Sequence, residues 1–167
     1  MKYFKIITLC SLIASFLTSC HRDLEQPPVS SLTIDQFFNN LDEAEIAVNG
    51  IYDVFGDQYY QYYIKMTDHG SHVSTTFQNN QNQNKFAFYT YTSGDKDLEV
   101  IWFSAYKGIY RANMVVNKLN SILVDPNNLE AVRLKSRLKG EAKFLRALLY
   151  FNLVRFWGDV PLVTEEL

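Results

Sequence analysis

The sequence contains little cysteine, proline and glycine, and its longest apolar run covers only about 12 residues. Its 167 residues include two cysteines, four prolines and seven glycines. Cys10 lies inside the N-terminal apolar run and Cys20 follows it closely, so residues 21–167 contain no thiol. Disulfides, cysteine nucleophiles and thiolate metal sites are therefore excluded for that part of the chain, and side-chain packing must stabilise it.

Basic residues are also few, and they form no cluster. The chain has 16 Lys and Arg against 18 Asp and Glu, and residues 1–19 contain two of the lysines and no acid. Without that segment, 14 basic and 18 acidic residues give a formal charge of −4. A nucleic-acid partner needs a basic surface, so we expect none. The chain also lacks a phosphate-binding loop, a nucleophile elbow and a dinucleotide fingerprint, and we therefore expect neither an enzyme nor a cofactor.

The N-terminus has the features of an export signal. Lys2 and Lys5 precede an apolar run, residues 6–17, which is too short to cross about 30 Å of hydrocarbon. Leu-Thr-Ser-Cys at 17–20 resembles a bacterial lipobox. We predict that residues 1–19 are a lipoprotein signal peptide and that Cys20 becomes a lipidated N-terminus, anchored by several acyl chains. The alternative is an ordinary signal peptide in which Cys20 stands by chance.

Residues 20–32 differ from both flanking segments. They are polar, include Pro27 and Pro28 and have no helical period, which is typical of an extended tether. Residues 33–167 then form one helical domain on this interpretation. The 148 residues that follow the signal could bury about 68% of their unfolded surface, so a true core is possible.

The apolar spacing predicts three helices after the tether. The first covers 41–56, with residues 59–63 as a possible continuation, and Asn40 and Glu43 have capping-box spacing before it, as do Thr33 and Gln36. The residues expected on its buried face are Ala44, Ala47, Val48, Ile51, Tyr52 and Phe55.

The second helix starts after Asp95 or Asp97 and continues to about residue 123. Its expected stripe is Leu98, Ile101, Trp102, Ala105, Ile109, Ala112, Val116 and Leu119. The third has Asp125 as N-cap and Pro126 as first residue, and ends near Trp157, before Gly158 and Pro161. Its expected seam is Leu134, Leu138, Ala142, Leu145 and Leu149, with Phe144, Leu148 and Phe151 beside it.

Short connections between such helices predict antiparallel helical hairpins, and hence an all-α fold. Gly140 lies within the third helix, where glycine costs about 1 kcal/mol relative to alanine. We therefore expect a neighbouring helix to approach closely at Gly140.

Residues 67–96 lack a helical period, and we predict one long irregular loop there. Within it, residues 77–95 mix aromatic rings, which suit the apolar side of a sugar ring, with amides that suit its hydroxyls. The candidates for ligand binding are Asn79, Asn80, Asn82, Tyr89 and Tyr91. The alternative is a solvated loop with a few aromatic side chains buried in the core.

Two further groups of polar residues have simpler explanations. Asp68, His69 and His72 have no fourth ligand near them in the sequence, so we predict no metal site. Asp95, Asp97 and Glu99 could be taken for glycosidase carboxylates. Their position at a predicted helix start is better explained by capping and by the helix dipole.

Three stretches together resemble the N-terminal part of the SusD/RagB family of outer-membrane lipoproteins. They are the tether after Cys20 with residues 35–38 and 44–52, then residues 102–113, and then residues 140–163, which end in Trp-Gly-Asp-Val-Pro-Leu-Val. Their order, their spacing and the Gly-Asp-Val-Pro exit distinguish them from generic helices. The resemblance implies a tetratricopeptide-like superhelix of helical hairpins.

The resemblance also implies a function. Proteins of this family are lipid-anchored at the outer membrane and capture glycans or other nutrients for a TonB-dependent (SusC-like) transporter. Part of the family's glycan site is expected near the 67–96 loop and the start of the next helix, which adds Trp102 and Asn113 as candidates. Both residues also fit as helix-packing positions.

Family members are much longer than this chain, which stops at Leu167, soon after the third stretch. We therefore expect a truncated gene product or a fragment that lacks the aromatic binding residues of the family's later half. Asp23 and Glu25 are compatible with export to the cell surface. Besides a surface-exposed nutrient-binding lipoprotein, two alternatives stay open. One is a lipid-anchored helical scaffold that binds only protein, and the other is a non-functional fragment.

Overall fold

The computed structural model describes residues 37–71, 73–74 and 84–165, and every regular element in these ranges is a helix. In chain order the elements are α2 (Leu41–Tyr52), the 3-10 turn η3 (Asp53–Phe55), α3 (Asp57–Ile64), the π-helical turn η4 (Lys65–His69), α4 (Lys96–Ser121) and α5 (Leu129–Trp157). The expected all-α class is confirmed. The predicted signal peptide, Cys20 and the tether lie outside the described residues, as do Thr33 and Gln36.

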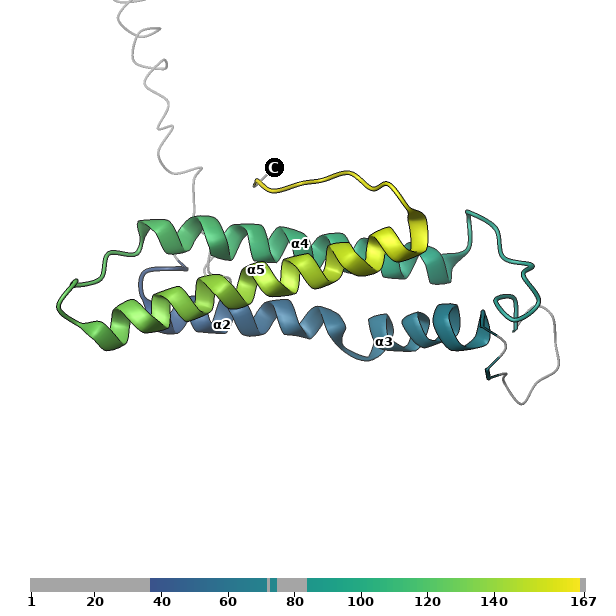
Figure 1. The fold of residues 1–167 in the computed structure, drawn as a ribbon, viewed down its shortest axis with the longest axis horizontal. Helices are drawn as coiled ribbons and strands as arrows, with labels where there is room; N and C mark the ends of the chain where they lie inside the picture. Colours follow the sequence, from purple (N-terminus) through teal and green to yellow (C-terminus); the bar gives the residue numbers. More distant parts are fainter. Residues whose placement is uncertain (1–36, 72, 75–83, 166–167) are drawn as a thin grey trace, which may run out of the picture. The chain divides into compact units, whose positions relative to one another are not determined.

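The chain divides into two compact units, 1–37 and 38–167, and the described helices belong to the second. In this unit α4 and α5 are antiparallel neighbours, α2 packs against both, and α3 packs against α4 (Figure 1). The expected antiparallel hairpins are therefore present. None of the helices within the described ranges is long and apolar enough to cross a membrane.

The ends of α2 show which local predictions hold. Asn40 is the N-cap, and its side-chain oxygen accepts from the Glu43 N–H at 2.9 Å. The Glu43 carboxylate reaches back to the N–H of Asn39, at 2.7 Å, rather than to that of Asn40. The helix ends at Tyr52 instead of residue 56, because the backbone tightens into η3. Residues 59–63 do form a helix, α3, and the helical turns then extend to His69, into the predicted loop.

The predicted start of α5 is wrong by three residues. Asp125 is not the N-cap, because its carboxylate accepts from the N–H of Asn127 at 2.9 Å and closes a turn. Asn128 caps the helix instead, accepting from the Ala131 N–H at 3.1 Å. The predicted end is confirmed at Trp157, and Gly158 follows with a φ of 74°, a conformation that glycine adopts without strain.

Two buried clusters form the core. The first lies where α2, α4 and α5 meet and contains Ala44, Val48, Ile51, Ala112, Val115, Leu119, Ile122, Leu138, Ala142 and Leu145. The second lies toward α3 and contains Val54, Tyr59, Ile101, Ala105, Ile109, Leu149 and Leu153. The predicted stripes supply most of these residues. Three of the predicted residues, Tyr52, Phe144 and Phe151, are exposed. Others are only partly buried, namely Ala47, Phe55, Leu98, Trp102, Val116, Leu134 and Leu148.

The close helix approach predicted at Gly140 is wrong. A Cβ atom placed at Gly140 would meet no neighbour within 4 Å, and the residue is exposed. The close approach occurs at Gly108 of α4, where a Cβ would lie 2.5 Å from Leu149 Cδ1 and 3.2 Å from Val54 Cγ1. Gly108 is buried, and the side chains of Leu149 on α5 and Val54 on η3 fill the space beside its backbone.

Substituting the two glycines with alanine should have opposite effects on the free energy of unfolding. Gly108→Ala should lower it by about 1–2 kcal/mol, since overpacking a core outweighs the gain in helix propensity. Gly140→Ala should raise it by about 0.5–1 kcal/mol, since only propensity changes. Urea unfolding followed by circular dichroism measures both. Equal effects at the two positions would contradict the assigned packing.

Candidate functional site

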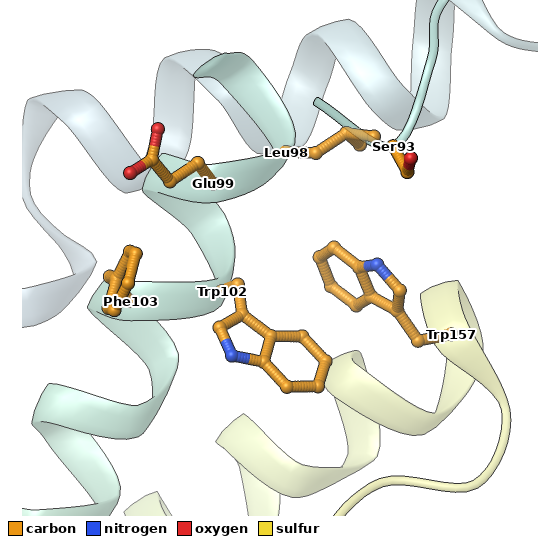
Figure 2. Close-up of a pocket in the computed structure, with 6 residues that line it drawn as sticks. All are labelled: Ser93, Leu98, Glu99, Trp102, Phe103 and Trp157. Atoms are coloured by element: carbon orange, nitrogen blue, oxygen red, sulfur yellow. The ribbon is translucent and has the colours of Figure 1, made fainter. Parts of the chain in front are cut away.

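An open pocket of about 260 Å³ lies where α4 begins and α5 ends. Its lining residues are Ser93, Leu98, Glu99, Trp102, Phe103 and Trp157. Figure 2 shows the two indoles converging from the two helices. The sequence has two tryptophans in all, and both are in this lining.

The helical hairpin itself assembles the pocket. Glu99, Trp102 and Phe103 lie on successive turns at the start of α4, so their side chains follow one side of that helix. Trp157 is the last residue of α5. Because the helices are antiparallel, the first turns of α4 face the last turn of α5. Ser93 comes from the segment that leads into α4.

Aromatic contacts connect the pocket with the core. Trp102 meets Trp157 edge to face, with ring centroids 5.3 Å apart and planes at 79°, and Tyr106 lies 5.0 Å from Trp102. Further contacts at 5.4–6.0 Å form a chain from Trp157 through Phe156, Tyr63 and Tyr59 to Phe55. Such pairs contribute about 0.5–1.5 kcal/mol each beyond their buried area. The two indoles are thus held by packing before any ligand arrives.

An ion-pair network joins the preceding segment to the start of α4. The Lys85 ammonium lies 2.6 Å from Asp95 Oδ1 and 3.4 Å from Asp97 Oδ2, and Lys65 lies 3.8 Å from Asp97. The Asp95 carboxylate also accepts from the Thr92 N–H at 2.6 Å. The network fixes the direction from which residues 84–95 enter α4, and thus the place of Ser93.

These contacts shift the pKa values of both partners in the central pair. Lys85 and the Thr92 N–H lower the pKa of the Asp95 carboxyl below its ordinary value of 3.8. Burial alone would lower the pKa of Lys85, but its bonds with Asp95 and Asp97 outweigh that effect and raise it above 10.5. Asp95 therefore stays charged and serves the ion pair. Asp95 is the N-cap residue of α4, as the capping explanation predicts, but its side chain makes no bond to the first turn of the helix.

The predicted ligand residues fall in three places. Trp102 lines the pocket. Tyr89 and Tyr91 are exposed but fixed: the Tyr89 hydroxyl donates to the Gly70 carbonyl at 2.5 Å, and the Tyr91 ring lies 5.1 Å from the buried Phe86. Neither tyrosine is in the pocket lining. Asn79, Asn80 and Asn82 lie outside the described residues.

Asn113, the other candidate, is fully buried and does not line the pocket. Its side-chain amide donates to the backbone carbonyl of Val163. Sequence reasoning missed Phe103, Trp157, Ser93 and Leu98 as site residues. The predicted hairpin contained a clue to Trp157, since the end of one helix must lie beside the start of its antiparallel partner.

Of Asp68, His69 and His72, the structure describes the first two. His69 belongs to η4, and His72 lies outside the described residues. Over residues 37–71, 73–74 and 84–165, no group of three His, Cys, Asp or Glu side chains could hold a metal ion.

The pocket combines chemistry that suits a sugar. Indole faces pack against the apolar side of a pyranose, and the Glu99 carboxylate and Ser93 hydroxyl can bind its hydroxyl groups. Phe103, which is 64% exposed, adds an open aromatic face. Among the described residues that line the pocket, Glu99 is the one carboxylate.

Comparisons with known proteins point to one family. A SusD-like family model, described as starch-binding associating with outer membrane, matches residues 23–166. One SusD-like protein of Formosa agariphila is 27% identical across 100% of this chain and 32% of its own length. Another is 28% identical across 99% and 32%, and a SusD-like protein of Bacteroides ovatus is 22% identical across 97% and 29%. The chain thus spans about a third of the length of these relatives. No solved structure matches.

The Lys85–Asp95 pair predicts a pH-dependent contribution to stability. A lowered carboxyl pKa stabilises the fold above about pH 3.8, and that contribution is lost as the pH falls through the lower pKa of the folded state. The difference in free energy of unfolding between the wild type and Asp95→Asn should therefore shrink between pH 5 and pH 2. Urea titrations at a series of pH values measure it. A difference that is constant over this range would contradict the assignment.

Proposed function

The chain belongs to the SusD-like family, and we propose that it takes part in nutrient uptake at the outer membrane by binding an oligosaccharide in the aromatic pocket. The observation that carries the proposal is the meeting of both tryptophans with Phe103, Glu99 and Ser93 around one open cavity. Small-molecule pockets usually measure about 300–1,000 Å³, so about 260 Å³ suits one or two sugar units of a longer chain.

The proposal also includes a lipid anchor at Cys20 and a transporter as partner. Cys20 carries lipid and attaches the protein to the outer membrane at the cell surface, and residues 20–32 hold the helical domain away from the lipid. A TonB-dependent transporter of the SusC type receives the oligosaccharide, and the protein itself does not act as an enzyme. The lipobox-like Leu-Thr-Ser-Cys and the family's description as starch-binding and associating with the outer membrane support this setting.

A lipid-anchored scaffold that binds only protein is the second candidate, and one observation favours it. Phe144, Ala147, Phe151 and Val154 are exposed on one side of α5, at the i, i+3, i+7 and i+10 spacing of a helix face. An apolar stripe of this kind is typical of a surface that another helix covers.

Variants at the pocket should weaken oligosaccharide binding. Phe103→Ala removes an exposed aromatic face, and Glu99→Gln removes a charged acceptor, so each should weaken maltoheptaose binding about tenfold. Isothermal titration of the detergent-solubilised full chain measures the dissociation constants.

Phe144→Ala is the matched control, because Phe144 is 65% exposed, as Phe103 is, but lies on the α5 stripe. Its affinity should equal that of the wild type. If maltoheptaose and a panel of other oligosaccharides all fail to bind, the pocket proposal is wrong. Co-purification of a transporter that is lost in Phe144→Ala, with flat oligosaccharide titrations, would favour the scaffold.

A further inference from the structure

The segment after α5 is held against the helices by side chains of α4 and α5. We call residues 159–165 the strap; Figure 1 shows it turning back over the helix pair. The Tyr106 hydroxyl donates to the Pro161 carbonyl at 2.8 Å. The Tyr150 hydroxyl donates to the Val163 carbonyl at 3.0 Å and accepts from the Val163 N–H at 2.7 Å. One hydroxyl therefore satisfies both backbone groups of Val163.

Asn113 adds the buried anchor. Its side chain is fully buried, and Nδ2 donates to the Val163 carbonyl at 2.9 Å and to the Glu165 carbonyl at 3.4 Å. The Arg146 guanidinium donates to Asn113 Oδ1 at 2.7 Å. A guanidinium has only donors and a carbonyl only acceptors, so these partners determine which end of the amide faces the strap. Arg146 thus orients Asn113, and Asn113 holds the strap.

The strap joins the pocket at its first residues. Trp157 directly precedes Gly158, where the positive φ reverses the chain into the strap. Val160 of the strap packs into the second core cluster, together with Trp102, Tyr106 and Trp157. Tyr106 contacts both the pocket and the strap, because its ring packs against Trp102 and its hydroxyl donates to the Pro161 carbonyl. The Trp157 indole is therefore held by its contact with Trp102 of α4 and by the cluster that includes Val160 of the strap.

We propose that Asn113 and Tyr150 are positioning residues for the aromatic pocket: by fixing the strap they hold the last turn of α5 and the Trp157 indole in place. Neither residue is in the pocket lining. Last turns of helices fray readily unless they are held, so a released strap would let Trp157 leave its edge-to-face contact with Trp102. The consequence for ligand affinity rests on the proposed function; the consequence for the two indoles does not.

Two nearly isosteric variants of the full chain test the proposal. Tyr150→Phe keeps the ring and removes the hydroxyl that binds Val163. Asn113→Asp keeps the volume and the pairing with Arg146, but places a carboxylate oxygen against two carbonyl oxygens. Tyr110→Phe is the control, because Tyr110 lies exposed on α4 and its hydroxyl takes no part in the strap contacts described above.

Three measurements separate a positioning role from a merely structural one. Hydrogen exchange of the Val163 amide reports the strap, the near-ultraviolet circular dichroism of the two tryptophans reports the indole pair, and maltoheptaose titration reports the pocket. In Tyr150→Phe and Asn113→Asp, amide protection should fall, the tryptophan signal should weaken and affinity should drop about three- to tenfold. Tyr110→Phe should match the wild type in all three.

The outcomes are distinct. If Val163 loses its protection in Tyr150→Phe while the tryptophan signal and the affinity stay at wild-type values, the strap does not position the pocket and the proposal is overturned. If the wild type binds no oligosaccharide but the tryptophan signal weakens in both variants, the positioning role is supported and the proposed function is wrong. Should Asn113→Asp fail to fold, the milder Tyr150→Phe still decides the question.

Discussion

The structure depends on the contact between α4 and α5 at Gly108. Without a side chain at that position, the buried Leu149 and Val54 come within van der Waals distance of the α4 backbone. Leu149 and Val54 belong to the second core cluster, as do Ala105 and Ile109, which flank Gly108 on α4. The same packing brings the first turns of α4 beside the last turn of α5, where the pocket lies. The candidate site is therefore a consequence of how the two longest helices pack.

Residues from separate parts of the sequence acquire a shared role in this arrangement. The stretches 102–113 and 140–163, which suggested the family resemblance, meet in the structure. Tyr106 and Asn113 from residues 102–113 bind the backbone of Pro161 and Val163, at the end of residues 140–163, and of Glu165 just beyond it. Trp102 from the first and Trp157 from the second form the aromatic pair of the pocket. The two stretches that carry the family resemblance are thus the ones that contact each other through α4, α5 and the strap.

The features that could be predicted from the sequence are those that follow from helical periodicity. Apolar spacing identified the helices and most buried residues, because a helix must bury one face. It failed where local alternatives compete. Asp125 forms a turn with Asn127 and leaves the cap to Asn128, although both are good capping residues. Gly140 and Gly108 both lie within helices, and the sequence alone does not show which glycine a neighbouring element approaches. Trp102 was found from the resemblance, whereas Phe103 and Trp157 needed the packing of the hairpin.

On the proposed function, the pocket between α4 and α5 binds a saccharide. The most direct test is the nuclear magnetic resonance of the two indole N–H groups, since Trp102 and Trp157 are the two tryptophans of the sequence. On titration with maltoheptaose, both indole signals should shift and saturate with the same dissociation constant. If neither indole signal moves with maltoheptaose or any other oligosaccharide of a broad panel, the claim is contradicted.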